Sequence, residues 1–208
     1  MFARANGKEL WVMIMEKVWA KLHGSYSKIM AGQSYEVYRD LLGAPSFYHK
    51  TNEDYIWEKV YSGYQNEFIM SATSYPNDMD LVNLENTGII ALQSYSILRI
   101  AIVPDSNGSQ VRLIQLRNPQ AKFEWKGEWS DGSEAWTDQA KQIVNYQNND
   151  DGVFFMAFEE FVHYFVSVHI CKYVDGYLYN NMRVQGDREY HIFNMLLSKA
   201  GNYTFSIS

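Results

Sequence analysis

Apolar residues in the first third of the chain recur at the spacing of helices. From Lys8 to His23 they return every three or four positions, which is the repeat of one helix face, and Gly24 then stands where helices commonly end. The same pattern predicts a short helix after Gly32 and another over residues 54–64. Apolar stripes of this kind usually pack on a core, so we expect the first helix to be a packed one.

From residue 88 onward the pattern is that of strands. Residues 88–103 hold enough β-branched and aromatic side chains for two strands, 104–108 form a turn, and 111–117 return as the second arm of a hairpin. The other expected elements are strands over 68–71, 154–158 and 166–173, a loop over 74–86, a weak helix over 138–146 and a helical turn over 159–164. The fold class predicted is α+β, an antiparallel sheet with flanking helices.

Composition narrows the classes of function. The chain has 208 residues, of which 47% are hydrophobic and 16% aromatic, so it can bury a core. Its net charge of −6 disfavours nucleic acid and anionic membranes as partners, because phosphate contacts need clustered lysine and arginine. The apolar run over 97–103, which Arg99 interrupts, is too short to span a bilayer, and the N-terminus lacks the layout of a signal peptide. Cys171 is the only cysteine, which excludes a disulfide within the chain and suits a reducing cytoplasm.

Three segments of the chain resemble the calpain family of cysteine proteases. They cover residues 9–26, which end in Lys-Leu-His-Gly-Ser-Tyr, residues 117–131, which contain Arg-Asn-Pro and Glu-Trp-Lys-Gly-Glu-Trp-Ser-Asp, and residues 151–171. The resemblance implies a papain-like calpain core in three parts. Residues 1–43 would be a helical remnant of the cysteine-bearing first half, 44–173 the second half with the active-site histidine and asparagine, and 174–208 the start of a β-sandwich. In the family the nucleophile precedes the long helix, and we expect this chain to lack it.

The resemblance also locates the residues that would carry catalysis. A thiol protease needs a cysteine nucleophile, a histidine that accepts its proton and an asparagine or aspartate that orients the imidazole. The family's histidine lies in a strand motif that here reads Gly-Ile-Ile-Ala-Leu-Gln-Ser-Tyr-Ser, which puts Gln93 at the histidine position. The asparagine is retained as Asn118, while Gln120 replaces the tryptophan that shields it and Ala121 replaces a glycine. Because an amide cannot accept a proton near neutral pH, we expect no peptidase activity and interpret Asn118 as a relic.

Cys171 is the one candidate for a replacement nucleophile. His163 and His169 are candidate bases, and His169 would share a strand face with Cys171, which makes a catalytic pair or a metal site between them conceivable. The surrounding segment resembles the last strand of the family's core, where the cysteine is a packing residue, and lone cysteines are often buried. We therefore expect Cys171 to be structural.

A calcium site is the second property that the resemblance implies. The family's ligands in this half of the core correspond here to Glu124, Asp131, the carbonyl of Asn149 and Asp151. Such oxygen ligands on loops are those that calcium prefers. A further family ligand, a glutamate, is replaced by Val153, so we expect a weakened site that water or a neighbouring acid would have to complete. The alternative is an ordinary solvated acidic turn.

We interpret the chain as a calpain-like pseudoprotease domain that serves as a structural or protein-interaction module and that binds calcium if the weakened site is competent. The expected partners are other proteins of a larger cytoplasmic assembly, with a cytoskeletal or ciliary setting suggested by the family's spread. Residues 190–197 and 203–208 read as strands without a sheet, which could pair with another chain. Two alternatives stay open: a fragment or subunit of a calcium-dependent cysteine endopeptidase whose nucleophile lies outside this chain, and a calcium-binding regulator.

Overall fold

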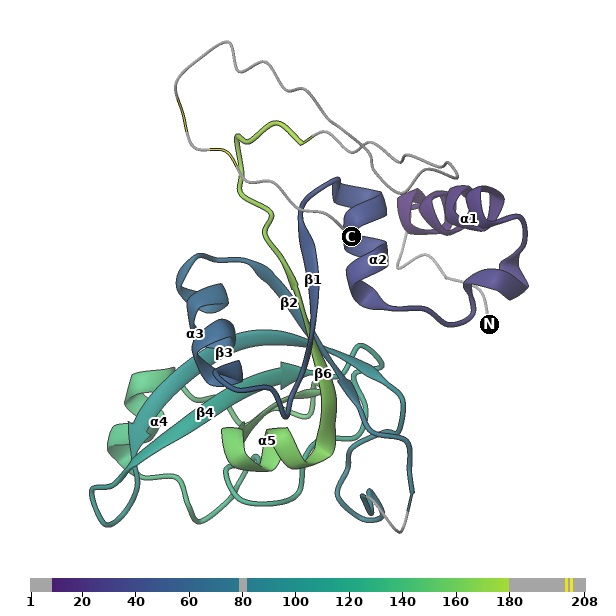
Figure 1. Ribbon diagram of the computed structural model, residues 1–208. Coiled ribbons are helices and arrows are strands. Elements are labelled where there is room, and N and C mark those ends of the chain that lie inside the picture. Colours follow the sequence, from purple (N-terminus) through teal and green to yellow (C-terminus); the bar gives the residue numbers. More distant parts are fainter. Residues whose placement is uncertain (1–8, 79–81, 180–200, 202, 204–208) are drawn as a thin grey trace.

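Six strands form a single antiparallel sheet in the spatial order β1-β6-β2-β3-β4-β5 (Figure 1). This architecture comes from a computed structural model, which describes residues 9–78, 82–179, 201 and 203. The strands are β1 (Ser46–Lys50), β2 (Ile69–Ser74), β3 (Ser94–Pro104), β4 (Gln110–Arg117), β5 (Val153–Ala157) and β6 (Phe165–Cys171). The helices are α1 (Trp11–His23), the short 3-10 helix η1 (Tyr26–Ile29), α2 (Ser34–Leu42), α3 (Ile56–Gln65), α4 (Asp138–Val144) and α5 (Phe158–Tyr164). The predicted α+β class is confirmed.

The helices lie where the sequence pattern predicts them. α1 and α2 end at Gly24 and Gly43, whose φ angles of 93° and 68° belong to the left-handed region that glycine adopts without steric cost. α3 turns Ile56 and Val60 into the core, as its spacing predicts. The side chain of Thr137 caps α4 by accepting a backbone N–H from its first turn. Local sequence signals therefore set the ends of these helices.

The strand predictions need a correction over residues 88–103. The two strands expected there are one, β3, because the first residues form a turn instead. The backbone N–H of Ile90 donates to the hydroxyl of Tyr95 at 2.9 Å, and that of Leu92 donates to the carbonyl of Tyr75 at 3.2 Å. These amides are used within loops and cannot join a strand ladder, although their side chains are typical of strands.

The structure also contains a strand that the pattern does not indicate. β1 is an edge strand that pairs only with β6, and its five residues show no regular alternation of buried and exposed side chains. The hairpin of β3 and β4 is confirmed. Its turn is closed by Asp105, whose Oδ1 accepts the N–H groups of Asn107 and Ser109, both at 2.8 Å.

The sheet is covered on both faces. Alternate residues of β3, β4 and β5 join a large core with α3 and α5, in which Tyr95, Phe154 and Phe161 are almost fully buried. The intervening residues, Leu113 and Phe155 among them, build a second core with α4 and the loop that precedes it. That loop, residues 118–137, is therefore part of the packed structure, which matters because it carries most of the residues singled out by the resemblance.

Where α2 packs on β1 and β6, the covered face of the sheet is polar. His169 is fully buried there, and its Nε2 lies 3.2 Å from the hydroxyls of both Thr73 and Ser167. The ring of Tyr35 in α2 stacks on the imidazole with 5.9 Å between the ring centroids. Burial, with a contribution from the charge of His49, lowers the pKa of His169 to about 4. The imidazole is therefore neutral at neutral pH.

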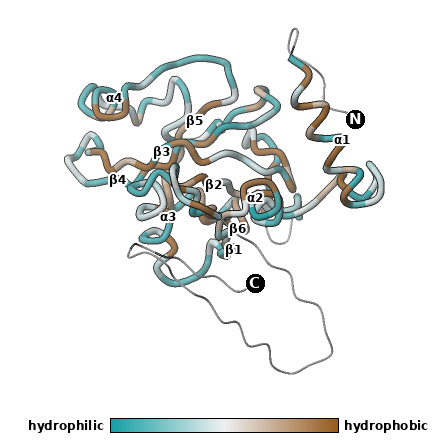
Figure 2. Tube along the Cα trace, turned by 90° about the horizontal axis from the view of Figure 1, so that it is seen from above, coloured by the Kyte–Doolittle hydropathy of each residue, from teal (hydrophilic) through white to brown (hydrophobic). Residues whose placement is uncertain are grey.

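The apolar stripe of α1 is uncovered, which contradicts the expectation of a packed helix. Only Ala20 of this helix is buried, while Trp11, Ile14 and Leu22 are 62%, 58% and 73% exposed. Figure 2 shows α1 at the margin of the molecule with hydrophobic residues along it, and its main contacts are with η1. Periodicity predicts that residues share a face, but it does not say whether another element covers that face.

The division of the chain into 1–43, 44–173 and 174–208 stays a prediction. After β6 the structure describes only residues 172–179, 201 and 203, so the strands expected over 190–197 and 203–208 lie almost entirely outside the described residues. Within the described ranges no helix has the length and apolar character needed to cross a membrane.

Candidate functional site

Gln93 and Gln120 lie side by side at the position where the resemblance requires a catalytic imidazole. Gln120 Nε2 donates to Gln93 Oε1 at 3.2 Å, and Gln93 Nε2 donates to the carbonyl of Ser94 at 3.0 Å. The backbone of Gln93 is held by Ser74, whose hydroxyl accepts its N–H at 3.0 Å. Both polar ends of the Gln93 amide are thus engaged with other amides. Because this group does not take up a proton near neutral pH, it cannot serve as a general base.

Asn118 points into its own loop and is fully buried. Its Nδ2 donates to the carbonyl of Lys122 and, at 3.2 Å, to that of Phe123, while its Oδ1 accepts the N–H of Gln120 at 3.0 Å. These hydrogen bonds occupy the whole amide and close the turn that follows β4. In this fold the amide of Asn118 therefore holds the loop together.

The thiol of Cys171 lies in a different part of the sheet. Cys171 is fully buried in β6, opposite Ser46 of β1 and Ile69 of β2, and burial raises its pKa. His169 shares its face, but Nε2 of this imidazole is hydrogen-bonded to hydroxyl groups, and His163 is exposed on α5. The expected burial of Cys171 is confirmed, and a buried, protonated thiol is a poor nucleophile.

The acidic residues named by the resemblance organise the loop before β5. Glu124 Oε1 accepts the backbone N–H groups of Asp151 at 3.0 Å and Gly152 at 2.6 Å. Asp131 Oδ2 accepts the backbone N–H of Asn149 at 3.2 Å. The structure therefore brings Glu124, Asp131, Asn149 and Asp151 together, and it uses the first two carboxylates as acceptors for backbone amides of the loop that carries the other two.

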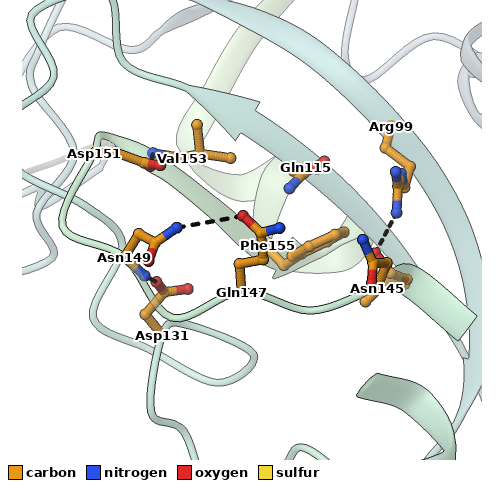
Figure 3. Close-up of a pocket in the computed structure, with 10 residues that line it drawn as sticks. Arg99, Gln115, Asp131, Asn145, Gln147, Asn149, Asp151, Val153 and Phe155 are labelled. Carbon is orange, nitrogen blue, oxygen red and sulfur yellow. Dashed lines mark hydrogen bonds between the residues drawn. The ribbon is translucent and has the colours of Figure 1, made fainter. Parts of the chain in front are cut away.

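A polar pocket of about 220 Å³ opens beside these groups. Figure 3 shows Asp131, Asn149 and Asp151 at one end of this pocket and Arg99 at the other. Burial raises the pKa of Asp131 to about 6, and the negative charges of Glu124 and Asp151 add to this effect against the opposing hydrogen bond from Asn149. The like-charge contribution indicates that the carboxylates act on one another.

The donor set suits calcium only in part. Glu124 Oε2, Asp131 Oδ1 and Asp151 Oδ2 accept no hydrogen bond from a described residue, so each carboxylate keeps one oxygen for a ligand. As they lie, however, no three acidic, histidine or cysteine side chains in the described part of the chain are close enough together to hold a metal ion. Val153, at the remaining family position, offers no side-chain oxygen. A calcium ion would need these carboxylates to move closer together.

The tryptophans of the acidic loop are packing residues. Trp125, Trp129 and Trp136 are 6%, 3% and 6% exposed. Trp125 Nε1 donates to the carbonyl of Glu128 at 2.8 Å, Trp136 Nε1 donates to that of Ser130 at 3.0 Å, and the rings of Trp129 and Trp136 meet edge to face with centroids 5.0 Å apart. These three rings pack the loop against the sheet and offer no exposed aromatic platform.

Two features of this site were not identified from the sequence. Arg99 extends from β3 into the pocket and donates to the carbonyl of Val144 at the end of α4; its only sequence signal is that it interrupts an apolar run. Gly88 lies so close to the acidic loop that a Cβ added there would be 1.7 Å from the carbonyl oxygen of Glu124. The turn that leads to Gln93 and the loop that carries Glu124 are thus in direct backbone contact.

Together, the six-stranded antiparallel sheet and its flanking helices have the architecture of a calpain-type protease core domain. The chain belongs to the calpain family, because residues 1–172 match the family model described as calpain family cysteine protease. It is 33% identical over 175 residues to calpain-type cysteine protease DEK1 of Zea mays, covering 79% of this chain and 8% of that protein. It is 30% identical over 183 residues to calpain-14 of Homo sapiens, covering 86% of this chain and 26% of that protein. The chain thus spans about a quarter or less of the length of these relatives.

Proposed function

We propose that this chain is a non-catalytic calpain-like core domain that acts as a protein-interaction module. The observation that carries the proposal is the hydrogen bond between Gln93 and Gln120 at the position of the family's histidine. A thiol protease lowers its barrier by moving a proton from sulfur to imidazole, and an amide cannot take that proton. The buried, protonated thiol of Cys171 supports the same conclusion.

The uncovered face of α1 supports the interaction role. Leu10, Trp11, Ile14, Val18 and Leu22 are each about half or more exposed, at 56%, 62%, 58%, 48% and 73%. Exposed apolar side chains that share one face commonly mark protein contacts. The partner that would suit this face is a polypeptide with an apolar surface of its own, and the resemblance suggests the cysteine-bearing half of a calpain-type core.

An experiment with that half separates the proposal from the alternative of a divided enzyme. This chain would be mixed with a separately produced cysteine-bearing half of a calpain-type core, and both binding and calcium-dependent casein cleavage would be measured. Binding without cleavage is expected. The double variant Ile14→Glu/Leu22→Glu should weaken binding about tenfold or more, because two apolar side chains that the partner would cover become carboxylates. Lys17→Glu/Lys21→Glu also places two carboxylates on exposed positions of the helix, but it removes no apolar side chain and should change binding less. Cleavage by the mixture would establish the divided enzyme and refute the non-catalytic proposal.

A second proposed property is weak calcium binding by Glu124, Asp131 and Asp151. It is supported by the pKa of Asp131, which burial raises first and the negative charges of Glu124 and Asp151 raise further, since a cation would offset the repulsion among these carboxylates. Because one family ligand is Val153, we expect a dissociation constant of about 10⁻⁴ to 10⁻³ M, the range of the weaker protein sites. Isothermal titration with calcium, repeated on Asp131→Asn, tests this. Absence of heat up to 10 times that concentration, or an unchanged titration of Asp131→Asn, would refute it.

A further inference from the structure

A second cavity lies between β1, α3 and the end of β6. Its volume is about 690 Å³, within the range of about 300–1,000 Å³ typical of small-molecule pockets. None of the residues discussed for catalysis or calcium lines it. Phe47, Tyr55 and Phe68 contribute aromatic walls, and His49, Lys59 and Lys172 contribute nitrogen-bearing groups.

The nitrogen-bearing groups converge on one wall of this cavity. Lys59 Nζ lies 3.2 Å from His49 Nδ1 and 2.8 Å from Glu53 Oε2. His49 Nδ1 also lies 3.2 Å from Glu53 Oε2, so it accepts from Lys59 in one tautomer and donates to Glu53 in the other tautomer or when the ring is protonated. His49 Nε2 has no hydrogen-bond partner among the described residues. Lys172 Nζ lies 5.1 Å from the ring centre of Phe47.

Lys172 is the cation of this wall that is left for an anion, because Lys59 is already paired with Glu53. Glu53 is fully occupied, because its Oε1 accepts the N–H of Lys50 at 2.8 Å and its Oε2 faces Lys59 and His49. Lys172 forms no ion pair with a carboxylate of the described residues. Burial lowers the pKa of His49, and the charges of Lys59 and Lys172 lower it further against the opposing effect of Glu53. The positive charges of Lys59 and Lys172 therefore both act on the imidazole of His49.

The aromatic side chains of the cavity favour a ligand in which a flat apolar ring carries the anionic group. The ring of Phe47 already has a cation above it, and Tyr55 is a large aromatic side chain that is 76% exposed at the cavity. Aromatic side chains beside a few convergent polar groups are the usual composition of small-molecule sites. Glu58 also lines the cavity, so a cationic ligand is the competing class that a test must exclude.

We propose that this cavity binds a small aromatic anion, a ring bearing a carboxylate or phosphate group, with the anion held by Lys172 and by the Nε2–H of His49 when that imidazole is protonated. The ring would lie among the aromatic walls. This site is separate from the calpain-like loops, and the proposal does not depend on whether those loops are catalytic or bind calcium.

The test uses the full chain and four probes, with binding followed by calorimetry and by the NMR signals of His49. 2-Naphthoate is expected to bind with a dissociation constant near or below about 1 mM. The neutral analogue 2-naphthalenemethanol and the ring-free anion acetate should each bind about tenfold more weakly, because each lacks one half of the recognised chemistry. Phenyl phosphate distinguishes phosphate from carboxylate preference. Stronger binding of the cationic analogue 2-naphthylmethylammonium would overturn the proposal in favour of Glu58.

Matched variants locate the site. Lys172→Met should weaken 2-naphthoate binding about tenfold, and Lys172→Arg should retain it within about threefold, because the charge is kept. Lys126→Met removes an exposed lysine of the acidic loop and should change nothing. Binding of 2-naphthoate should also tighten between pH 7.5 and 5.5 as the anion draws a proton onto His49, whose charged neighbours are Lys59, Lys172, Glu53 and Glu58. Equal binding to the neutral analogue, equal binding to Lys172→Met, or an unmoved His49 signal at saturating 2-naphthoate would each refute the proposal.

Discussion

Acid should destabilise this domain through one buried imidazole. His169 is fully buried, and its folded pKa of about 4 lies below the value of about 6.5 expected in the unfolded chain. Between these two values the unfolded chain binds a proton that the folded chain rejects. The contribution of His169 to stability is therefore fully present above pH 6.5 and is lost as the pH falls toward 4, at about 1.4 kcal/mol per pH unit and about 3 kcal/mol in all.

The assay is urea unfolding at several pH values between 7.5 and 4, performed on the unmodified chain and on His169→Phe. The variant loses the hydrogen bonds to Thr73 and Ser167, so we expect it to be less stable at pH 7 by about 1–2 kcal/mol. Its stability should then fall less steeply with acid, and the two curves should converge or cross near pH 5. Thr73→Val, which keeps the imidazole, should retain the steep dependence. Parallel curves for the unmodified chain and His169→Phe would refute the reasoning.

Three further predictions concern the loops around the candidate site, all measured by chemical denaturation. Gly152→Ala should lower the free energy of unfolding by at least about 1 kcal/mol more than Gly108→Ala. Both glycines have φ near +80°, but only at Gly152 would an added Cβ meet backbone, at 2.7 Å from an α-carbon. Equal losses would show that the contact is relieved. Asn118→Ala should cost about 2–3 kcal/mol because it removes a buried amide and its three hydrogen bonds within the loop, and a cost below 0.5 kcal/mol would mean that the amide does not hold the loop. Trp136→Phe should cost about 1–2 kcal/mol through the lost N–H donor and the smaller ring, and no loss would contradict its place in the second core.

The sequence predicts local structure well where a single residue decides it. Glycine at helix ends and aspartate in the β3-β4 turn act within a few residues, and the structure shows the helix ends and the turn where the sequence predicts them. The turn before β3 was not predicted because tertiary hydrogen bonds stabilise it. The N–H of Leu92 donates to the carbonyl of Tyr75 and that of Ile90 to the hydroxyl of Tyr95, and neither contact can be read from the local pattern. Helix α1 was predicted correctly as a helix and wrongly as a packed one, because coverage depends on neighbours that periodicity cannot specify.

Some features of the candidate site could be predicted from the sequence, and others could not. The resemblance puts Gln93 at the position of the family's histidine, and because an amide does not accept a proton near neutral pH, the prediction of a non-catalytic chain could be made from the sequence alone. The orientation of Asn118 is geometric information, because only the folded loop shows that its amide is used by Lys122 and Phe123 carbonyl groups. The position of Arg99 also needs the folded structure, because Arg99 reaches the pocket only through the strand register that brings β3, β4 and β5 together.

The internal hydrogen bonds of Asn118 have a consequence for how activity is inferred across related chains. A residue that stabilises a loop is retained by selection for folding, so genetic drift can remove a nucleophile and a base while the asparagine stays. An asparagine at this position in a newly sequenced relative then indicates that the loop is stable and says little about whether the chain is catalytically active. Surveys that seek active proteases among such chains should weight titratable positions such as that of Gln93 above Asn118.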